Sequence, residues 1–187
     1  MVLVEKSDEE IVELIKAGDP EAFSVLLDRY LEKIKRYGRR FVYEKSNLDD
    51  LVQDVFIKVY VNIKSFSAGR RFSPWIYRIA HNEFVNAIRK RSYENLISLD
   101  FDTFLPRMVA PDNPAEDFDF KLLRDVVESS LSELDPKYRE VIVLYFFEEL
   151  DYQTISEVVA IPVATVGVRL KRAKEKLKKL LANKATL

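Results

Sequence analysis

Apolar residues recur at the spacing of an α-helix along almost the whole chain, and this pattern lapses in one interval, residues 92–118. Signals for helix starts accompany the pattern. Ser7 and Glu10 have the spacing of a capping box, and Asp19 precedes Pro20 as an N-cap precedes a first-position proline. No segment shows the alternation of apolar and polar residues expected of a strand. The sequence therefore predicts an all-α protein.

The interval without a helical pattern has a composition of its own, because three of the seven prolines fall there among acidic residues. Prolines and repeated like charges keep a chain extended, which is typical of a linker. We therefore expect two small helical domains, residues 1–92 and 119–187, joined by an acidic linker at residues 93–118. A length of 187 residues accommodates two such domains.

The composition also limits the class of protein. The chain has no cysteine, which excludes disulfides and thiolate metal sites. No apolar run approaches the roughly 20 residues that span a membrane. The first residues lack the basic start and the apolar core of a signal peptide. The sequence thus predicts a cytoplasmic protein that does not insert into membranes.

The net charge of −1 conceals two basic clusters. Local field, more than total charge, decides whether a surface attracts phosphates, so we expect two separate surfaces for nucleic acid. The first cluster is opposed only by Glu83, and the second only by Glu175. The first contains Arg70, Arg71, Arg78, Arg89, Lys90 and Arg91; the second contains Arg169, Lys171, Arg172, Lys174, Lys176, Lys178, Lys179 and Lys184.

Residues 151–181 have the proportions of a helix-turn-helix. Asp151 is a suitable N-cap for the first helix, and Pro162 suits the first turn of the second. The second helix has two faces, one anchoring and one cationic, as a DNA recognition helix has. A solvated basic helix that closes an ordinary bundle is the alternative. The anchoring face carries Val166, Leu170, Ala173, Leu177, Leu180 and Leu181; the cationic face carries Thr165, Arg169, Arg172, Lys176 and Lys179.

The first domain offers two regions for contact with a partner. On a helix expected at about residues 47–65, Asp50, Gln53 and Asp54 would be exposed beside an apolar face. A solvated helix face is the alternative for these three. The second region is the loop after this helix, where aromatic residues accompany Arg70.

Aromatic rings beside guanidinium groups suit single-stranded bases, which stack on rings while cations hold the backbone. Phe72 and Trp75 could instead belong to the core, and we expect this of Trp75. A fourth helix, capped at Ser73, would then carry Asn82 on the loop side, where an amide could read a base edge.

These motifs together resemble extracytoplasmic-function (ECF) sigma factors. The resemblance to region two of that family rests on residues 50–56, Phe66 and residues 72–82; the resemblance to region four rests on residues 134–135, 139–142, 151–155 and 161–166 with Arg169, Arg172 and Ala173. The motifs occur in the family's order, with a linker between them, and cover nearly the whole chain.

The resemblance implies an RNA polymerase sigma factor with a region-two bundle, a region-four helix-turn-helix, and core RNA polymerase and promoter DNA as partners. An anti-sigma factor is a further partner common in the family, although no residue here identifies one. Three groups of site residues follow from the resemblance: Asp50, Gln53 and Asp54 for core polymerase; Phe66, Ser67, Ala68, Gly69, Arg70, Arg71 and Asn82 for a flipped base of the −10 element; and Thr165, Val168, Arg169, Lys171, Arg172 and Lys174 for the −35 duplex.

Three positions depart from the family pattern. Gly167 and Val168 stand where relatives usually present a basic or hydroxyl side chain, and Tyr145 stands where many have arginine. Valine can contact a thymine methyl but cannot hydrogen-bond a base. We therefore expect −35 binding to depend on phosphate contacts and DNA shape more than on base edges.

Two other classes of function are alternatives. A stand-alone helix-turn-helix regulator would use the N-terminal helices to dimerise or sense, and would have no use for the basic, aromatic loop. An enzyme would need a convergent site, but the four glycines are scattered and His81, the only histidine, has no ligand pattern around it. We predict no catalytic residue, no cofactor and no metal, and we expect His81 to be structural or near DNA.

Overall fold

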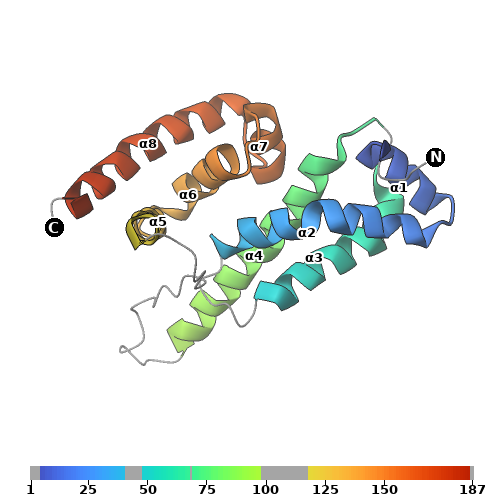
Figure 1. Cartoon of the computed structure of the whole chain (residues 1–187), viewed down its shortest axis with the longest axis horizontal. Coiled ribbons are helices and arrows are strands. Elements are labelled where there is room, and N and C mark those ends of the chain that lie inside the picture. The colour runs from blue at the N-terminus through green and yellow to red at the C-terminus, as the bar shows by residue number, and fades with distance from the viewer. Residues whose placement is uncertain (1–4, 41–47, 68, 98–117, 186–187) are drawn as a thin grey trace. The chain divides into compact units, whose positions relative to one another are not determined.

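The computed structural model describes residues 5–40, 48–67, 69–97 and 118–185, which form helices joined by turns (Figure 1). No strand occurs in these ranges. The chain divides into two compact units, one built around the helices up to Ile97 and the other around the helices from Phe118 onward. The all-α class and the two helical domains are confirmed.

The first unit is a bundle in which α2 packs against α3, α3 packs against α4, and α1 contacts both α2 and α4. Its elements are α1 (Asp8–Lys16), η2 (Pro20–Ala22), α2 (Phe23–Arg39), α3 (Leu48–Asn62), η4 (Ile63–Ser65) and α4 (Phe72–Ile97). Aromatic residues fill much of the core, because Tyr37, Phe72 and Phe84 are completely buried. The rings of Tyr37 and Phe84 lie 5.7 Å apart, and those of Tyr37 and Tyr77 are also 5.7 Å apart.

Two of the expected caps in this unit, Ser7 and Asp19, are confirmed. The Ser7 hydroxyl accepts from the Glu10 amide at 3.2 Å, while the Glu10 carboxylate accepts from the Ser7 amide at 2.7 Å. Hydrogen bonding to the Glu10 carboxylate, first by the Ser7 backbone amide and then by the Ser7 side chain, lowers the pKa of Glu10. Gly18, at φ +105°, follows the end of α1, and Asp19 caps the short η2 turn through its carboxylate.

The start expected for the fourth helix differs from the observed one. α4 begins at Phe72, so Ser73 lies inside the first turn and does not precede the helix as its cap. At its other end α4 continues past Ser92 to Ile97, so its last residues lie in the interval that lacks apolar periodicity. The rest of the expected acidic linker, residues 98–117, lies outside the described residues.

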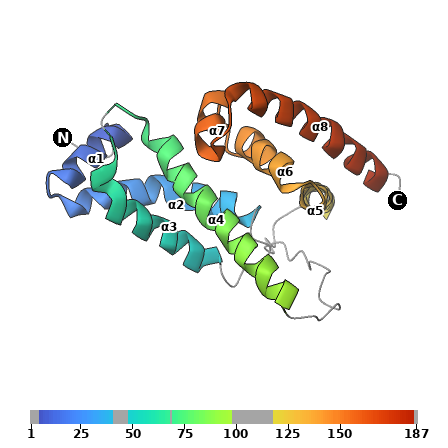
Figure 2. The same cartoon turned by 180° about the vertical axis from the view of Figure 1, so that it is seen from behind.

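The second unit is organised by its long last helix. α8 packs against α6 and α5 (Figure 2). The unit comprises α5 (Phe118–Ser132), α6 (Pro136–Ile142), the π-helical turn η5 (Val143–Phe147), α7 (Tyr152–Val159) and α8 (Val163–Ala185). Near the end of α8, Lys184 pairs with Glu133 at 2.6 Å and donates to Ser129 at 2.8 Å. These contacts fix α8 against the end of α5.

Among the described helices, no single one is both long and apolar enough to cross a membrane. The pair α7 and α8 passes that test only jointly, and it is bent by 99°.

Candidate nucleic-acid and polymerase interfaces

Residues 151–185 form a helix-turn-helix. The Asp151 carboxylate accepts from the Thr154 amide at 2.6 Å, which confirms it as the cap of α7. Ala160, at φ +54°, and Pro162 turn the chain by 99° into α8, within the range typical of this motif. The Pro162 carbonyl accepts from the Thr165 amide at 2.8 Å and so begins α8.

The anchoring face of α8 follows the sequence prediction. Val166, Leu170 and Ala173 are buried, and the leucines farther along the face are half-buried. This face fixes the rotation of α8, and the rotation decides which side chains remain available to DNA.

The residues expected at −35 DNA occupy more than one side of α8. At about 100° per residue, Thr165, Val168, Arg169 and Arg172 share one face, whereas Lys174 lies about 140° from Arg169. Val168 and Arg172 are exposed, and Val168 keeps 51% of its surface accessible. The structure thus brings four of the six residues together, whereas Lys171 and Lys174 lie about 60° apart on another side of the helix.

Arg169 is tied to a neighbouring helix. Its Nη1 atom donates to Oε1 of Glu140 on α6 at 2.6 Å, and both side chains are largely shielded from solvent. Burial raises the pKa of Glu140, whereas the Arg169 charge and hydrogen bond oppose that rise. Glu140 belongs to the family motif at residues 139–142, but no local pattern pairs it with Arg169, because the two residues are 29 positions apart.

Lys174 stands over two aromatic rings of η5. Its ammonium lies 4.9 Å from the ring centre of Phe146 and 5.5 Å from that of Tyr145. These are cation–π distances. Tyr145, one of the departures from the family pattern, therefore packs against a cation of the recognition helix.

On α3 the three residues expected to bind polymerase are exposed on the side opposite the core. Asp50, Gln53 and Asp54 are followed on the same side by Ile57 and Val61, whose surfaces remain 51% and 70% accessible. Large apolar side chains this exposed beside acids are typical of a surface that meets a partner. The apolar end of this stripe could have been found from the sequence, because it continues at the helical spacing.

The loop between η4 and α4 has a buried aromatic base and an exposed crest. Phe66 is only 4% accessible, and its ring lies 5.9 Å from that of Phe72 and 5.3 Å from that of Trp75. The core alternative is therefore confirmed for Phe72, and Phe66 is buried as well. Trp75, expected in the core, is half-buried in the same cluster. The crest residues Ser67, Gly69, Arg70 and Arg71 are exposed, with Gly69 at φ +87°; Ala68 lies outside the described residues.

The exposed face of α4 continues from this crest. Arg78, Asn82 and Arg89 are exposed and recur at helical spacing, so they share one face with the end of the loop. Glu83, the acid of this cluster, is paired with Lys58 of α3 at 2.6 Å. The α4 face is therefore cationic and carries two amides, Asn82 and Asn86.

His81 is structural. It is buried, and its Nδ1 atom lies 2.9 Å from the Tyr37 hydroxyl. Burial lowers its pKa to about 4, and the charge of Arg89 acts in the same direction. The imidazole is therefore neutral at physiological pH.

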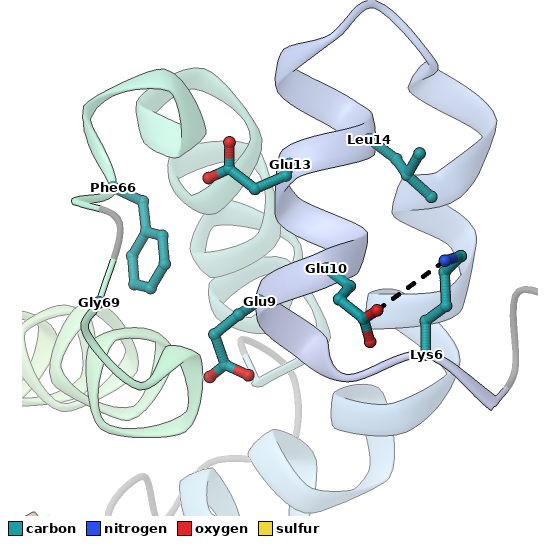
Figure 3. Close-up of a pocket in the computed structure, with 7 residues that line it drawn as sticks. All are labelled: Lys6, Glu9, Glu10, Glu13, Leu14, Phe66 and Gly69. Carbon is teal, nitrogen blue, oxygen red and sulfur yellow. Dashed lines mark ion pairs between the residues drawn. The ribbon is translucent and has the colours of Figure 1, made fainter.

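An open pocket of about 420 Å³ separates α1 from the loop (Figure 3). Glu9, Glu10 and Glu13 line its α1 side, and Phe66 and Gly69 line the other. Carboxylates repel phosphates, so this side of the loop disfavours a nucleic-acid backbone. Within the described ranges, no group of three or more His, Asp or Glu side chains could hold a metal ion.

Comparison with known proteins identifies both units. Residues 26–93 match the family model of sigma-70 region 2, and residues 124–177 match that of sigma-70 region 4. The chain is 35% identical over 176 residues to the ECF RNA polymerase sigma factor SigW of Bacillus subtilis (strain 168), covering 91% of this chain and 94% of the relative. It is 31% identical over 188 residues to the RNA polymerase sigma-H factor of Pseudomonas aeruginosa, covering 96% of each.

The fold agrees with a solved structure, that of CnrH in complex with the cytosolic domain of CnrY. The TM-score is 0.73 at 26% identity, over 95% of this chain and 99% of CnrH. With both units matched in order and relatives similar over nearly their full length, the chain belongs to the ECF sigma factors of RNA polymerase.

Proposed function

We propose that this chain binds core RNA polymerase in the cytoplasm, places it on promoters and helps to open the −10 region. Sigma factors are transcription initiation factors without catalysis of their own. The observation that carries the proposal is the pair of exposed cationic surfaces, the loop with the α4 face on one unit and α8 on the other. A promoter offers one melted and one paired stretch, and each needs a surface of its own.

The polymerase contact would be the α3 stripe formed by Asp50, Gln53, Asp54, Ile57 and Val61. Its acids would meet cationic groups on the polymerase, and its exposed apolar end would be covered by the partner. Apolar residues at the centre of an interface with a charged rim are the usual arrangement of a specific protein contact.

The −10 contact would be the crest from Ser67 to Arg71 together with Asn82 on α4. Extracting a base from the duplex costs a few kcal/mol, which the crest and the amide must return by binding that base. Phe66 would serve this site from beneath, as the buried foundation of the loop, because its ring packs against Phe72 and Trp75. The α4 cations Arg78 and Arg89 would hold the strand by its phosphates.

The −35 contact would be the N-terminal half of α8 in the major groove. Thr165, Val168 and Arg172 would face base edges and nearby phosphates, while Lys171 and Lys174, which lie together on another side of the helix, would contact the backbone. Arg169 would contact DNA with the donors left over from its bond to Glu140, since a guanidinium has five N–H groups.

The domain plan that goes with this proposal assigns residues 1–92 to polymerase and −10 DNA, residues 119–187 to −35 DNA, and residues 93–118 to an acidic linker. An anti-sigma factor is proposed as a further partner. The solved relative CnrH is itself bound to part of another protein, CnrY, which supports a partner of this kind. A stand-alone regulator is not favoured, because relatives similar over both units are sigma factors.

Transcription in vitro tests the proposal directly. Purified core RNA polymerase, genomic DNA and this chain are incubated with nucleotides, and the 5′ ends of the RNA are mapped. We expect start sites that are absent with core enzyme alone and that share two upstream elements. A chain that yields no defined start site with active core enzyme would refute the function.

A further inference from the structure

Both ends of the loop between η4 and α4 are hydrogen-bonded to side chains of α1. The Phe66 carbonyl, at the start of the loop, accepts from Lys16 Nζ at 2.7 Å. The Phe72 amide, at the end of the loop and the start of α4, donates to Glu9 Oε1 at 2.8 Å. Lys16 and Glu9 lie two helical turns apart on α1, and they reach residues 50 and 63 positions away in the chain.

Glu9 and Lys16 supply hydrogen-bonding partners that the loop itself lacks. The first amides of a helix have no partner within the helix, and no serine precedes α4 to cap it. The Glu9 carboxylate takes the place of that cap and also complements the positive end of the helix dipole. At the other end of the loop, the Lys16 ammonium donates to the Phe66 carbonyl and also lies 5.6 Å from the centre of the Phe66 ring.

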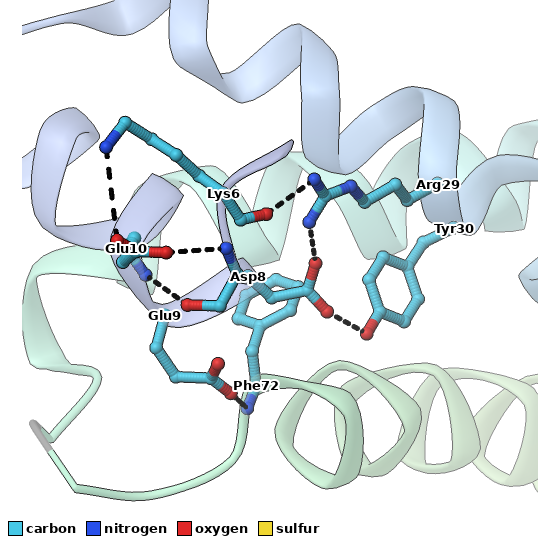
Figure 4. A network of polar contacts seen from close by, with 8 residues as sticks. Lys6, Asp8, Glu9, Glu10, Arg29, Tyr30 and Phe72 are labelled. Carbon is cyan, nitrogen blue, oxygen red and sulfur yellow. Dashed lines mark hydrogen bonds and ion pairs between the residues drawn. The ribbon is translucent and has the colours of Figure 1, made fainter. Parts of the chain in front are cut away.

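The helix that makes these bonds is itself held firmly. Asp8, the first residue of α1, bonds Arg29 Nη1 and the Tyr30 hydroxyl of α2, each at 2.5 Å (Figure 4). Arg29 also donates to the Lys6 carbonyl at 2.7 Å. Burial, and then the bond to Asp8, raises the pKa of Tyr30, so the phenol stays a donor at neutral pH. The buried residues Ile11, Val12 and Ile15 complete the attachment of α1.

We propose that α1 is a positioning element for promoter opening, in which Glu9 and Lys16 fix the two ends of the base-capturing loop. This rests on the function proposed above, and α1 lies outside the matched region-2 segment, which begins at residue 26. A loop held at both ends loses less conformational freedom when it binds a base, so more of the binding free energy remains to offset base extraction. Glu9 and Lys16 need not touch DNA for this role.

The test uses full-length variants in holoenzyme with core RNA polymerase. Glu9→Ala removes the acceptor at one end, and Lys16→Met removes the donor at the other while keeping the length of the side chain. Glu9→Gln and Lys16→Arg keep an acceptor and a donor in place. Glu21→Ala, an exposed residue of η2, makes the same charge change as Glu9→Ala away from the loop.

The readout is the affinity of holoenzyme for a single-stranded non-template −10 oligonucleotide, taken from a promoter mapped with this chain. Each oligonucleotide is compared with a version lacking the captured base, and the ratio of the two affinities measures base capture. Loss of one hydrogen bond is worth about 1 kcal/mol, so we expect Glu9→Ala and Lys16→Met each to lower this ratio about fivefold. The two conservative variants and Glu21→Ala should keep it.

A merely structural role for α1 predicts a different set of results. If both truncations lower affinity for the intact and the base-less strand equally, or weaken core polymerase binding to the same extent, the positioning role is overturned. It is also overturned if both truncations leave the ratio unchanged. These outcomes differ from failure of the proposed function, in which the wild-type chain itself produces no promoter start sites.

Discussion

On the exposed cationic face of α4, Asn82 lies between Arg78 and Arg89 and is the amide nearer the loop, with Asn86 one turn beyond it. Cations hold phosphates without regard to sequence, whereas an amide can pair with a base edge. At the scale of single residues, Asn82 is therefore the side chain on this face best suited to recognise an extracted base.

We expect Asn82→Ala to slow the opening of a duplex promoter about tenfold, which corresponds to about 1.4 kcal/mol of lost base contact. Transcription from a template with a pre-melted bubble should fall less, because the bases there are already unpaired. Permanganate footprinting and run-off transcription measure the two effects. Asn86→Ala, one turn farther along α4, is the control, and equal losses on both templates would contradict base capture by Asn82.

His81 gives the first unit a pH-dependent stability. The unfolded histidine binds a proton below about pH 6.5, whereas the folded one does so only near pH 4. Between these values the unfolded chain holds more protons, so the free energy of unfolding is greatest above pH 6.5 and falls as the pH drops toward 4. The expected loss is about 2 kcal/mol between pH 7 and pH 5.

Urea unfolding followed by tryptophan emission measures this loss, because Trp75, the only tryptophan, lies in the first unit. The variant His81→Gln keeps a polar partner for Tyr37 but does not titrate. It should remove most of the dependence between pH 7 and pH 5. An undiminished loss in the variant would assign the effect to other groups.

At the scale of helices, two glycines show how packing reverses a local preference. Glycine inside a helix is less favourable than alanine by about 1 kcal/mol, so sequence alone predicts that either replacement by alanine stabilises its helix. In α2, however, a Cβ on Gly38 would lie 2.6 Å from Leu48 Cδ1 and 2.9 Å from Phe84 Cζ. In α8, a Cβ on Gly167 would meet only Tyr152 Cε2, at 3.5 Å.

We expect Gly38→Ala to lower the free energy of unfolding of the first unit by about 1–2 kcal/mol, since overpacking of a filled core outweighs the gain in helix propensity. Gly167→Ala should raise the stability of the second unit by up to about 1 kcal/mol. Trp75 emission in urea reports the first change, and thermal melts by circular dichroism report the second. A stabilising Gly38→Ala would show that the bundle relaxes freely around α2.

The α3 stripe acts as one surface because the rotation of α3 presents acids and apolar residues together. Replacing Asp50 and Gln53 by alanine should weaken binding to core RNA polymerase about tenfold, because the variant loses a charge and a hydrogen-bonding amide from the stripe. Fluorescence anisotropy with labelled chain measures the affinity, and circular dichroism should show unchanged helical content. Asp28→Ala, an exposed acid on α2, is the matched control. Equal binding by the double variant and the wild type would reject this surface.

At the scale of the whole molecule, the two contacts proposed for one chain would reinforce each other. Once one unit was bound, the other would be held near its own promoter element, and its binding would become intramolecular. Neither the loop with the α4 face nor α8 would then need high affinity alone. The overall charge near neutrality, −1, is consistent with cations concentrated on the two surfaces proposed to meet phosphates.

The salt dependence of promoter binding by holoenzyme should reveal the contribution of α8. We expect Arg172→Ala and Lys171→Ala each to weaken binding and to reduce the slope of log K against log salt by roughly 0.9, one released counterion per lost phosphate contact. Lys178→Ala, two turns beyond Lys171, should leave the slope unchanged. Filter binding across a salt series provides the slopes. Slopes equal to that of the wild type for all three variants would exclude phosphate contacts at Lys171 and Arg172.

The sequence by itself determined the class of fold and the division into two helical units, because helical periodicity and end caps are local features. The spacing of Val166, Leu170 and Ala173 fixed the buried side of α8, and Asp151 fixed the start of α7. The motif order was enough for the family. The helix faces and the helix caps depend on residues three to seven positions apart, which a helix brings together on its own.

Only the tertiary structure decided which side chains are held in place and by what. Segments far apart in the chain are joined by Glu9 and Lys16 at the loop ends, by the bond between Glu140 and Arg169, and by the contacts at Gly38. No local pattern marks such pairs, because they arise from how helices dock and not from how each one forms. The burial of the Phe66 and Phe72 rings was also decided by the tertiary structure, because burial depends on how the helices pack.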